Sequence, residues 1–161
     1  MKQTLIVLGF FAVLLFTVFT GTACRREEDL NDKETRRPRA NLVLTVNDKT
    51  FYPSLEDNSS AEAFFEKLKE EGGSLELNLH DYGSFEKVGS LPWDLPRNDE
   101  QITTVPGDII LYQGNQLTIY YDENTWTFTR LGKINSVSKE DLLEVLGDGD
   151  VTVTFWLEWD E

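Results

Sequence analysis

Three chemically versatile residue types are almost missing from this chain, which has one histidine, one cysteine and one methionine among 161 residues. A single cysteine excludes an intrachain disulfide. Zinc sites are usually built from several cysteine and histidine ligands, so a zinc site of that kind is excluded as well. No serine stands in a Gly-x-Ser-x-Gly elbow, the frame that exposes the nucleophile of many hydrolases. The sequence therefore offers little of the chemistry that zinc enzymes and serine hydrolases require.

Positive charge is also scarce, with 15 Lys and Arg residues against 29 Asp and Glu residues. The imbalance is concentrated in residues 41–161, where eight basic and 24 acidic residues give a formal charge of −16. A surface of that charge repels nucleic acids and anionic lipids. We therefore expect no nucleic-acid partner and no direct docking of residues 41–161 on an anionic membrane.

Residues 1–23 have the layout of an export signal. Lys2 precedes a mostly apolar run from Leu5 to Phe19, and small residues lead directly to Cys24. The stretch "GTAC" resembles the lipobox of bacterial lipoproteins, in which the cysteine thiol is acylated and becomes the mature N-terminus. It departs from that pattern at Gly21, where leucine is usual. The resemblance implies a lipoprotein signal peptide at 1–23, lipidation of Cys24 and an extracytoplasmic domain anchored to the cell membrane.

Two other interpretations of this segment stay open. An uncleaved membrane anchor also fits, because Gln3 to Ala23 comprises 21 uncharged residues, near the roughly 20 that cross a bilayer. Arg25 and Arg26 would then lie on the side that the positive-inside tendency disfavours. A plain cleaved signal would instead leave a free thiol. Residues 24–40 are mostly charged, with one leucine and one proline, and predict a flexible tether.

Residues 41–161 have the hydrophobic pattern of one folded domain. Alternating apolar side chains predict strands in "NLVLTVNDKTFYPSL", "SLELNLHDYG" and "VTVTFWLEWD", and three more in "DIILYQGNQLTIYYDENTWTFTRLGKI". The stretch 84–107 contains three prolines and is predicted to be irregular. At least seven short strands without β-α-β alternation favour a closed antiparallel barrel, with helices at its ends.

Two amphipathic helices are predicted in this domain, each with recognisable ends. The first lies in "NSSAEAFFEKLKEEGG", where Ser59 and Glu62 fit a capping box and Gly72 and Gly73 fit a left-handed stop. The second lies in "SVSKEDLLEVLGDGD". There Ser138 is the expected N-cap, paired with Asp141, and Gly147 is the expected end.

Several segments together resemble one bacterial family, the cyclophilin-like domain of unknown function. The segments are "LTVNDKTFYPSLEDNSSAEAF", "LPWDLP", "GDIILYQGNQLTIYY", "FTRLGKI" and "LGDGDVTVTF", which run from Leu44 to Phe155. The resemblance implies a mainly β, closed antiparallel cyclophilin-like barrel with two short helices. It implies no activity and no cofactor, because most members have no assigned activity.

The chain departs from true cyclophilins, which are peptidyl-prolyl isomerases with a Phe-His-Arg stretch on an early strand. No arginine lies between Asn41 and Pro96, and His80 stands in "LHDYG" instead. A Gln-Gly-Gly-Asp stretch is also missing from the sequence. The isomerase residues therefore cannot be carried over, and we expect no isomerase activity at the level of cyclophilins.

Trp126, Phe128 and Arg130 alternate in "WTFTRLGKI" and are predicted to share one face of a strand. They could form an aromatic pocket whose guanidinium binds a proline-like or carboxylate-bearing ligand. The alternative, which we favour, is that Arg130 pairs with an acid while its stem covers the aromatic rings. Trp93, in "LPWDLP", either fixes the longest loop to the barrel or lines the mouth of a ligand site.

Two further clusters are better explained by structure than by chemistry. His80 and Asp81 are expected at the exposed end of a strand, because no nucleophile accompanies them. Asp148 and Asp150, in "GDGD", lack the remaining ligands of a calcium loop and predict a turn before the last strand. We therefore expect no metal and no cofactor.

These features together favour a membrane-tethered, extracytoplasmic domain that binds a small ligand or a peptide without catalysis. A divergent peptidyl-prolyl isomerase is the alternative. The two hypotheses differ in one structural requirement, because an isomerase needs a positioned donor above an apolar pocket for the proline ring. Only Arg97 or Arg130 could supply a guanidinium there. The sequence carries no indication of an oligomeric state.

Overall fold

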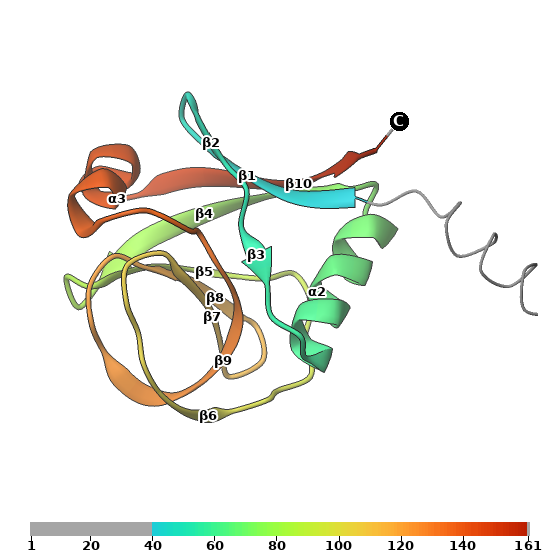
Figure 1. Ribbon diagram of the computed structural model, residues 1–161, viewed down its shortest axis with the longest axis horizontal. Coiled ribbons are helices and arrows are strands. Elements are labelled where there is room, and N and C mark those ends of the chain that lie inside the picture. The colour runs from blue at the N-terminus through green and yellow to red at the C-terminus, as the bar shows by residue number, and fades with distance from the viewer. Residues whose placement is uncertain (1–39, 161) are drawn as a thin grey trace, which may run out of the picture. The chain divides into compact units, whose positions relative to one another are not determined.

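The computed structural model describes residues 40–160, so the predicted signal peptide, Cys24 and the tether before Ala40 lie outside the described residues. Figure 1 shows a strongly curled antiparallel sheet with one helix near each end. The helices are α2 (Ser59–Glu70) and α3 (Lys139–Leu146). The strands are β1 (Ala40–Val46), β2 (Lys49–Phe51), β3 (Ser54–Leu55), β4 (Ser74–Tyr82), β5 (Glu86–Ser90), β6 (Glu100–Thr103), β7 (Asp108–Tyr112), β8 (Gln116–Tyr120), β9 (Thr125–Lys133) and β10 (Val151–Trp159).

The sheet is a curled half-barrel, and the prediction of a closed barrel is wrong. Its strands pair in the order β2-β1-β10-β4-β5-β8-β7-β9-β3, and β6 pairs with the first half of β9. Among residues 40–160, no ladder joins β2 to β3. These two strands are consecutive in the chain, separated by Tyr52 and the buried Pro53. Proline has no N–H to donate and interrupts a strand ladder. The strands before and after Pro53, β2 and β3, are therefore the two edges of the sheet.

The two faces of the curled sheet carry separate apolar clusters. In β8, Leu117 and Ile119 point into the main core, whereas Tyr120 belongs to a second cluster on the outer face. The main core also contains residues from β1, β4, β7 and β10 together with one side of each helix. The outer cluster contains Ile102, Ile110, Tyr120 and Phe128. It forms where β6 and the start of β9 fold over the sheet, and it supports the site described below.

Helix α2 packs its apolar side on the main core, but it begins one residue earlier than predicted. The N-cap is Asn58, whose side-chain oxygen accepts from the backbone N–H groups of Ser60 at 3.0 Å and Ala61 at 2.9 Å. The expected capping box at Ser59 is therefore wrong. The predicted end of the helix is confirmed, because Gly72 and Gly73 both take positive φ values.

Helix α3 begins and ends as predicted. Ser138 and Asp141 form a reciprocal capping box, and Gly147 follows the last helical residue with φ 64°. The stretch 84–107 differs from the prediction, because it contains both β5 and β6. Within residues 40–160, neither helix has the length and hydropathy needed to span a membrane.

Candidate binding site

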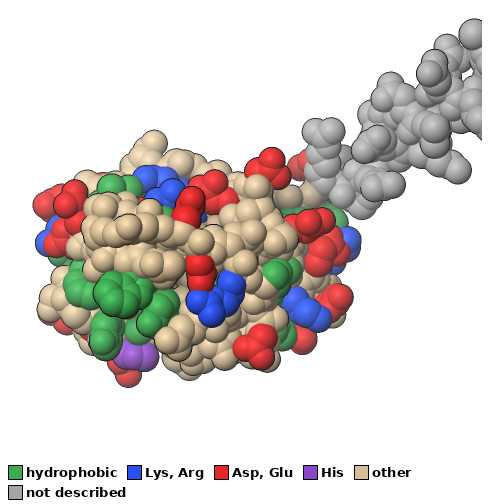
Figure 2. Space-filling view, turned by 90° about the horizontal axis from the view of Figure 1, so that it is seen from below, with side chains coloured by type: hydrophobic (Ala, Val, Ile, Leu, Met, Phe, Trp, Pro, Cys, Tyr) green, Lys and Arg blue, Asp and Glu red, His purple; other side chains and the backbone are tan. Residues whose placement is uncertain are grey.

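A pocket of about 490 Å³ opens on the outer face of the sheet. Alternate residues of β4, β5, β7 and β8 form its floor, and the first half of β9 forms one wall. In Figure 2, hydrophobic side chains gather on this side of the molecule, next to the histidine. The volume lies within the range of about 300–1,000 Å³ that is usual for small-molecule sites.

Six aromatic side chains line the pocket, and five of them contact one another in a chain that does not include Trp126. The Phe85 ring stacks on Tyr120, with centroids 6.1 Å apart, and Tyr120 lies 5.7 Å from Phe128. The remaining rings are Tyr82, Tyr112 and Trp126. Tyr120 and Phe128 are buried, whereas Trp126 is 60% exposed. The pocket thus has a fixed aromatic wall that becomes more exposed toward Trp126.

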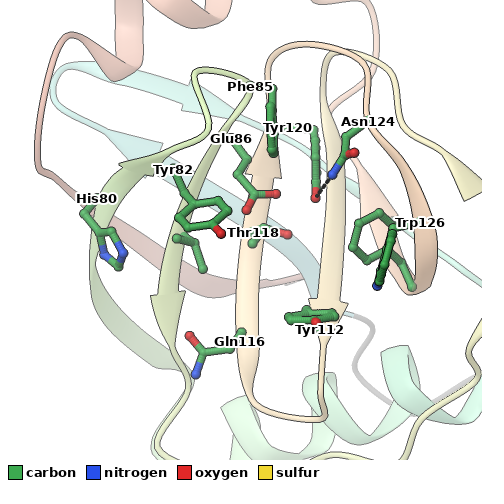
Figure 3. Close-up of a pocket in the computed structure, with 12 residues that line it drawn as sticks. His80, Tyr82, Phe85, Glu86, Tyr112, Gln116, Thr118, Tyr120, Asn124 and Trp126 are labelled. Atoms are coloured by element: carbon green, nitrogen blue, oxygen red, sulfur yellow. Dashed lines mark hydrogen bonds between the residues drawn. The ribbon is translucent and has the colours of Figure 1, made fainter.

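One carboxyl group is buried beside this wall. Glu86 is only 7% exposed, and its Oε2 atom is buried without a hydrogen-bond partner among the described residues. In Figure 3 the carboxyl group lies between Tyr82 and Tyr120. Burial raises the pKa of Glu86, and the nearby Tyr120 hydroxyl opposes that rise. A buried polar atom without a partner is uncommon in folded proteins and points to a group that would complete it.

The hydroxyl of Tyr120 lies deep in the same pocket. It accepts from the Asn124 side-chain N–H at 3.4 Å, the contact drawn in Figure 3. Burial raises the pKa of Tyr120, and the adjacent Glu86 carboxyl raises it further. The phenol is therefore a neutral hydrogen-bonding group at ordinary pH. His80, Gln116 and Thr118 add further polar side chains to the lining.

Arg130 does not line this pocket, although Trp126 and Phe128 do. Its Nη2 atom lies 3.2 Å from the Oδ2 atom of Asp108, a carboxylate that is 1% exposed. Lys133 approaches the other oxygen of Asp108 at 3.5 Å. The guanidinium thus forms an ion pair that joins β9 to β7, and its Nε atom is buried without a partner among the described residues.

Trp93 lies elsewhere and packs on helix α2. Its ring meets that of Phe64 edge to face, with centroids 6.3 Å apart, and its indole N–H points to Glu71 Oε1 at 3.4 Å. This is the arrangement expected if Trp93 fixes the long loop to the domain. Of the four residues singled out from the sequence, the structure brings together only Trp126 and Phe128.

The "GDGD" turn is held by a lysine. Lys87 is completely buried, and its ammonium group donates to the carbonyl oxygens of Gly147 at 2.8 Å and Gly149 at 2.6 Å. Asp81 Oδ1 lies 2.8 Å from the same nitrogen. Asp81 is thus turned away from His80, which lines the outer pocket, and the two residues do not act as an acid–base pair.

Most of the residues that line the pocket were not predicted from the sequence, and the reason can be identified. Tyr112, Thr118 and Tyr120 stand at alternate positions of "DIILYQGNQLTIYY", between residues that point into the core. That alternation could have revealed an aromatic outer face. Glu86 lies in β5, which the prolines farther along that stretch had suggested was irregular.

Comparison with known proteins gives one match, to the cyclophilin-like family over residues 44–156. No curated protein matches the sequence, and no solved structure matches the fold. The matched segment covers nearly all of the described domain, and it agrees with the resemblance of the segments between Leu44 and Phe155. The chain therefore belongs to the cyclophilin-like family.

Proposed function

We propose that this chain is a lipid-anchored, extracytoplasmic binding module of the cyclophilin-like family. Its ligand would be a small molecule or a side chain of a peptide, held in the outer-face pocket without chemical change. The observation that carries the proposal is the pocket itself, a concave aromatic site with one buried, incompletely satisfied carboxyl group. Few polar groups within a mostly apolar lining are typical of sites that bind small ligands.

The isomerase alternative has less support. Neither Arg97 nor Arg130 is among the residues that line the pocket, and each forms an ion pair with an aspartate, Asp99 for Arg97 and Asp108 for Arg130. The Nε atom of Arg130 is buried without a partner among the described residues, but neither guanidinium is positioned over the apolar pocket that a prolyl ring would need. We therefore expect the protein to leave the isomerisation rate of a proline-containing peptide at its background value.

Membrane attachment rests on the sequence of residues 1–40. The charge of the domain supports a tethered arrangement, because eight basic and 24 acidic residues in 41–161 disfavour direct contact with anionic lipid. Anchoring through Cys24 would hold the pocket near the membrane while leaving it open to solvent.

The binding function can be tested by NMR on the full-length protein. Small aromatic compounds of neutral, cationic and anionic charge are added, and the indole N–H signals are followed. We expect at least one compound to shift the Trp126 signal. In Trp126→Ala, which lacks this signal, binding is followed by the broadening of the compound's own resonances and should be abolished, whereas Trp159→Ala, at an exposed tryptophan outside the pocket, should preserve it. If no compound perturbs the pocket, or if Trp126→Ala binds as well as the wild type, the proposal is wrong.

A further inference from the structure

We propose that the pocket is selective for organic cations that carry N–H groups, with a primary ammonium on an apolar body as the simplest case. This inference rests on the proposed binding function and specifies its ligand. The ammonium N–H groups would donate to Glu86, and the apolar body would lie against the aromatic wall formed by Tyr82, Phe85, Tyr112, Tyr120, Trp126 and Phe128.

The two buried carboxyl groups of the described chain differ in a way that identifies the missing partner. Asp108 has partners at both carboxylate oxygens, which are Arg130 at 3.2 Å, Lys133 at 3.5 Å and the Val105 backbone N–H at 3.1 Å. Glu86 has no cationic partner within residues 40–160, and its Oε2 atom accepts no hydrogen bond there. Buried charges in proteins are normally paired and hydrogen-bonded. Oε2 of Glu86 therefore lacks a donor, and a cation that carries N–H groups would supply both the donor and the charge that stabilises the ionised carboxyl group.

That cation cannot come from the pocket's own lining. Among the described residues that form it, none is a lysine or an arginine, and His80 is the only one that can carry positive charge. In Figure 3 the His80 ring lies at the far side of Tyr82 from the Glu86 carboxyl group. The pocket thus presents one acidic group to whatever enters it.

The aromatic wall provides a second, independent attraction for a cation. Ring faces carry negative electrostatic potential, and a cation within about 6 Å of a ring centroid is stabilised by it. The rings of Phe85, Tyr120 and Phe128 are fixed by mutual contacts at 6.1 and 5.7 Å, so little ordering is required on binding. Tyr82 and Trp126 are 61% and 60% exposed and can cover a ligand that sits over Glu86.

Charge complementarity also argues against an anionic ligand. A carboxylate-bearing ligand in the pocket would face Glu86 directly, and Arg130, which pairs with Asp108, does not line the pocket. The formal charge of −16 on residues 41–161 attracts cations over a longer range. A quaternary ammonium could interact with the ring faces, but it could not donate a hydrogen bond to Glu86 Oε2, since it has no N–H group. The inference therefore ranks primary amines above their trimethylated forms.

The test is calorimetric titration of the full-length protein with four probes of similar shape. They are phenethylamine, trimethyl(phenethyl)ammonium, 2-phenylethanol and 3-phenylpropionate. We expect phenethylamine to bind about tenfold or more tightly than 2-phenylethanol, and 3-phenylpropionate to bind most weakly. Glu86→Gln should weaken the amine by about tenfold while changing the alcohol by less than about twofold. Glu76→Gln, an exposed acid on the same strand as His80, is the control for net charge.

Each possible result of these titrations either supports or overturns the selectivity for organic cations. Equal binding of amine and alcohol, or an amine affinity unchanged by Glu86→Gln, would overturn cation selectivity while leaving the binding function intact. Tighter binding of the trimethylammonium probe would overturn the assigned role of Glu86 as acceptor. If Glu86→Gln fails to fold, Trp126→Ala at an exposed position provides the second variant and should also reduce amine binding. If no probe of any charge binds, both the inference and the proposed function fail.

Discussion

At the scale of single residues, Lys87 shows how a buried charge can organise a fold. Its ammonium donates to the carbonyl oxygens of Gly147 and Gly149 and pairs with Asp81, so its three N–H groups are all used. The hydrogen bond from Lys87 is the main cause that lowers the pKa of Asp81, burial opposes it, and the Gly149 N–H adds to the lowering. This arrangement fixes the turn between α3 and β10 to the sheet.

We predict that Lys87→Met destabilises the domain by about 2 kcal/mol, because the carbonyl oxygens of Gly147 and Gly149 and the Asp81 carboxylate lose the buried ammonium group that binds them. The loss should depend on pH. Since the pKa of Asp81 is lowered in the folded state, its contribution is present above the ordinary aspartate pKa and is lost as the pH falls through the lowered value. Urea unfolding from neutral to acidic pH measures both effects. An equally steep acid dependence in wild type and variant would contradict this role.

Residue patterns alone could identify only part of the site. Trp126 and Phe128 are found from the alternation in "WTFTR", and both line the pocket. Arg130 obeys the same alternation, but which of 24 acids in residues 41–161 it would meet depends on the pairing of β9 with β7. Glu86 could not be singled out, because it lies beside Tyr120 only through the pairing of β5 with β8, in which the two residues are opposite each other.

At the scale of elements, the start of α2 joins a helix to the edge of the sheet. Asn58 caps the helix through its side-chain oxygen, and its side-chain N–H donates to the Arg130 carbonyl oxygen at 2.9 Å. Ser60 donates to the Pro96 carbonyl oxygen at 2.6 Å and thereby fixes the loop that carries Trp93. One helix terminus thus connects three segments that are far apart in the sequence.

We predict that Asn58→Ala costs about 1–2 kcal/mol of stability, because both the cap and the bond to β9 are lost. Ser59→Ala is the matched control. Ser59 was the cap expected from the sequence, but it is the first helical residue and its hydroxyl only accepts from Asn98. We expect the control to cost less than about 0.5 kcal/mol. The stability of both variants, measured by thermal unfolding, distinguishes an N-cap at Asn58 from one at Ser59. Equal losses of stability would contradict a cap at Asn58.

The elements that were predicted correctly have strong local signals, and the missed elements do not. Helix α3 and strands β1, β4 and β10 follow from capping residues or from clean apolar alternation. Strand β6 consists of "EQIT", with one buried side chain, and exists because it pairs with β9. The capping residue of α2 was misplaced because Asn58, Ser59 and Ser60 are all competent caps. Only tertiary contacts decide among them.

At the scale of the whole molecule, the curled sheet places the main core and the candidate binding site on opposite faces. The inner face holds the main apolar core, and the outer face holds the aromatic pocket with Glu86. Because side chains alternate between faces along each strand, substitutions in the pocket need not disturb the core. An acidic domain of this kind is repelled by anionic membrane surfaces. The proposed membrane attachment is therefore assigned to residues 1–40 and not to the surface of the domain.

We predict that Cys24 is lipid-modified and is the mature N-terminus in a bacterial host. A single acyl chain binds a bilayer only marginally, whereas two or more give stable anchoring, and lipoprotein processing supplies more than one. The full-length protein should therefore lose residues 1–23, gain the mass of its acyl chains and partition with membranes. In Cys24→Ser, acylation and the cleavage that depends on it should both be absent. Intact mass and membrane fractionation measure these changes. A wild-type mass that still includes residues 1–23 would favour an uncleaved anchor, and a cleaved chain with an unmodified thiol would favour a plain signal peptide.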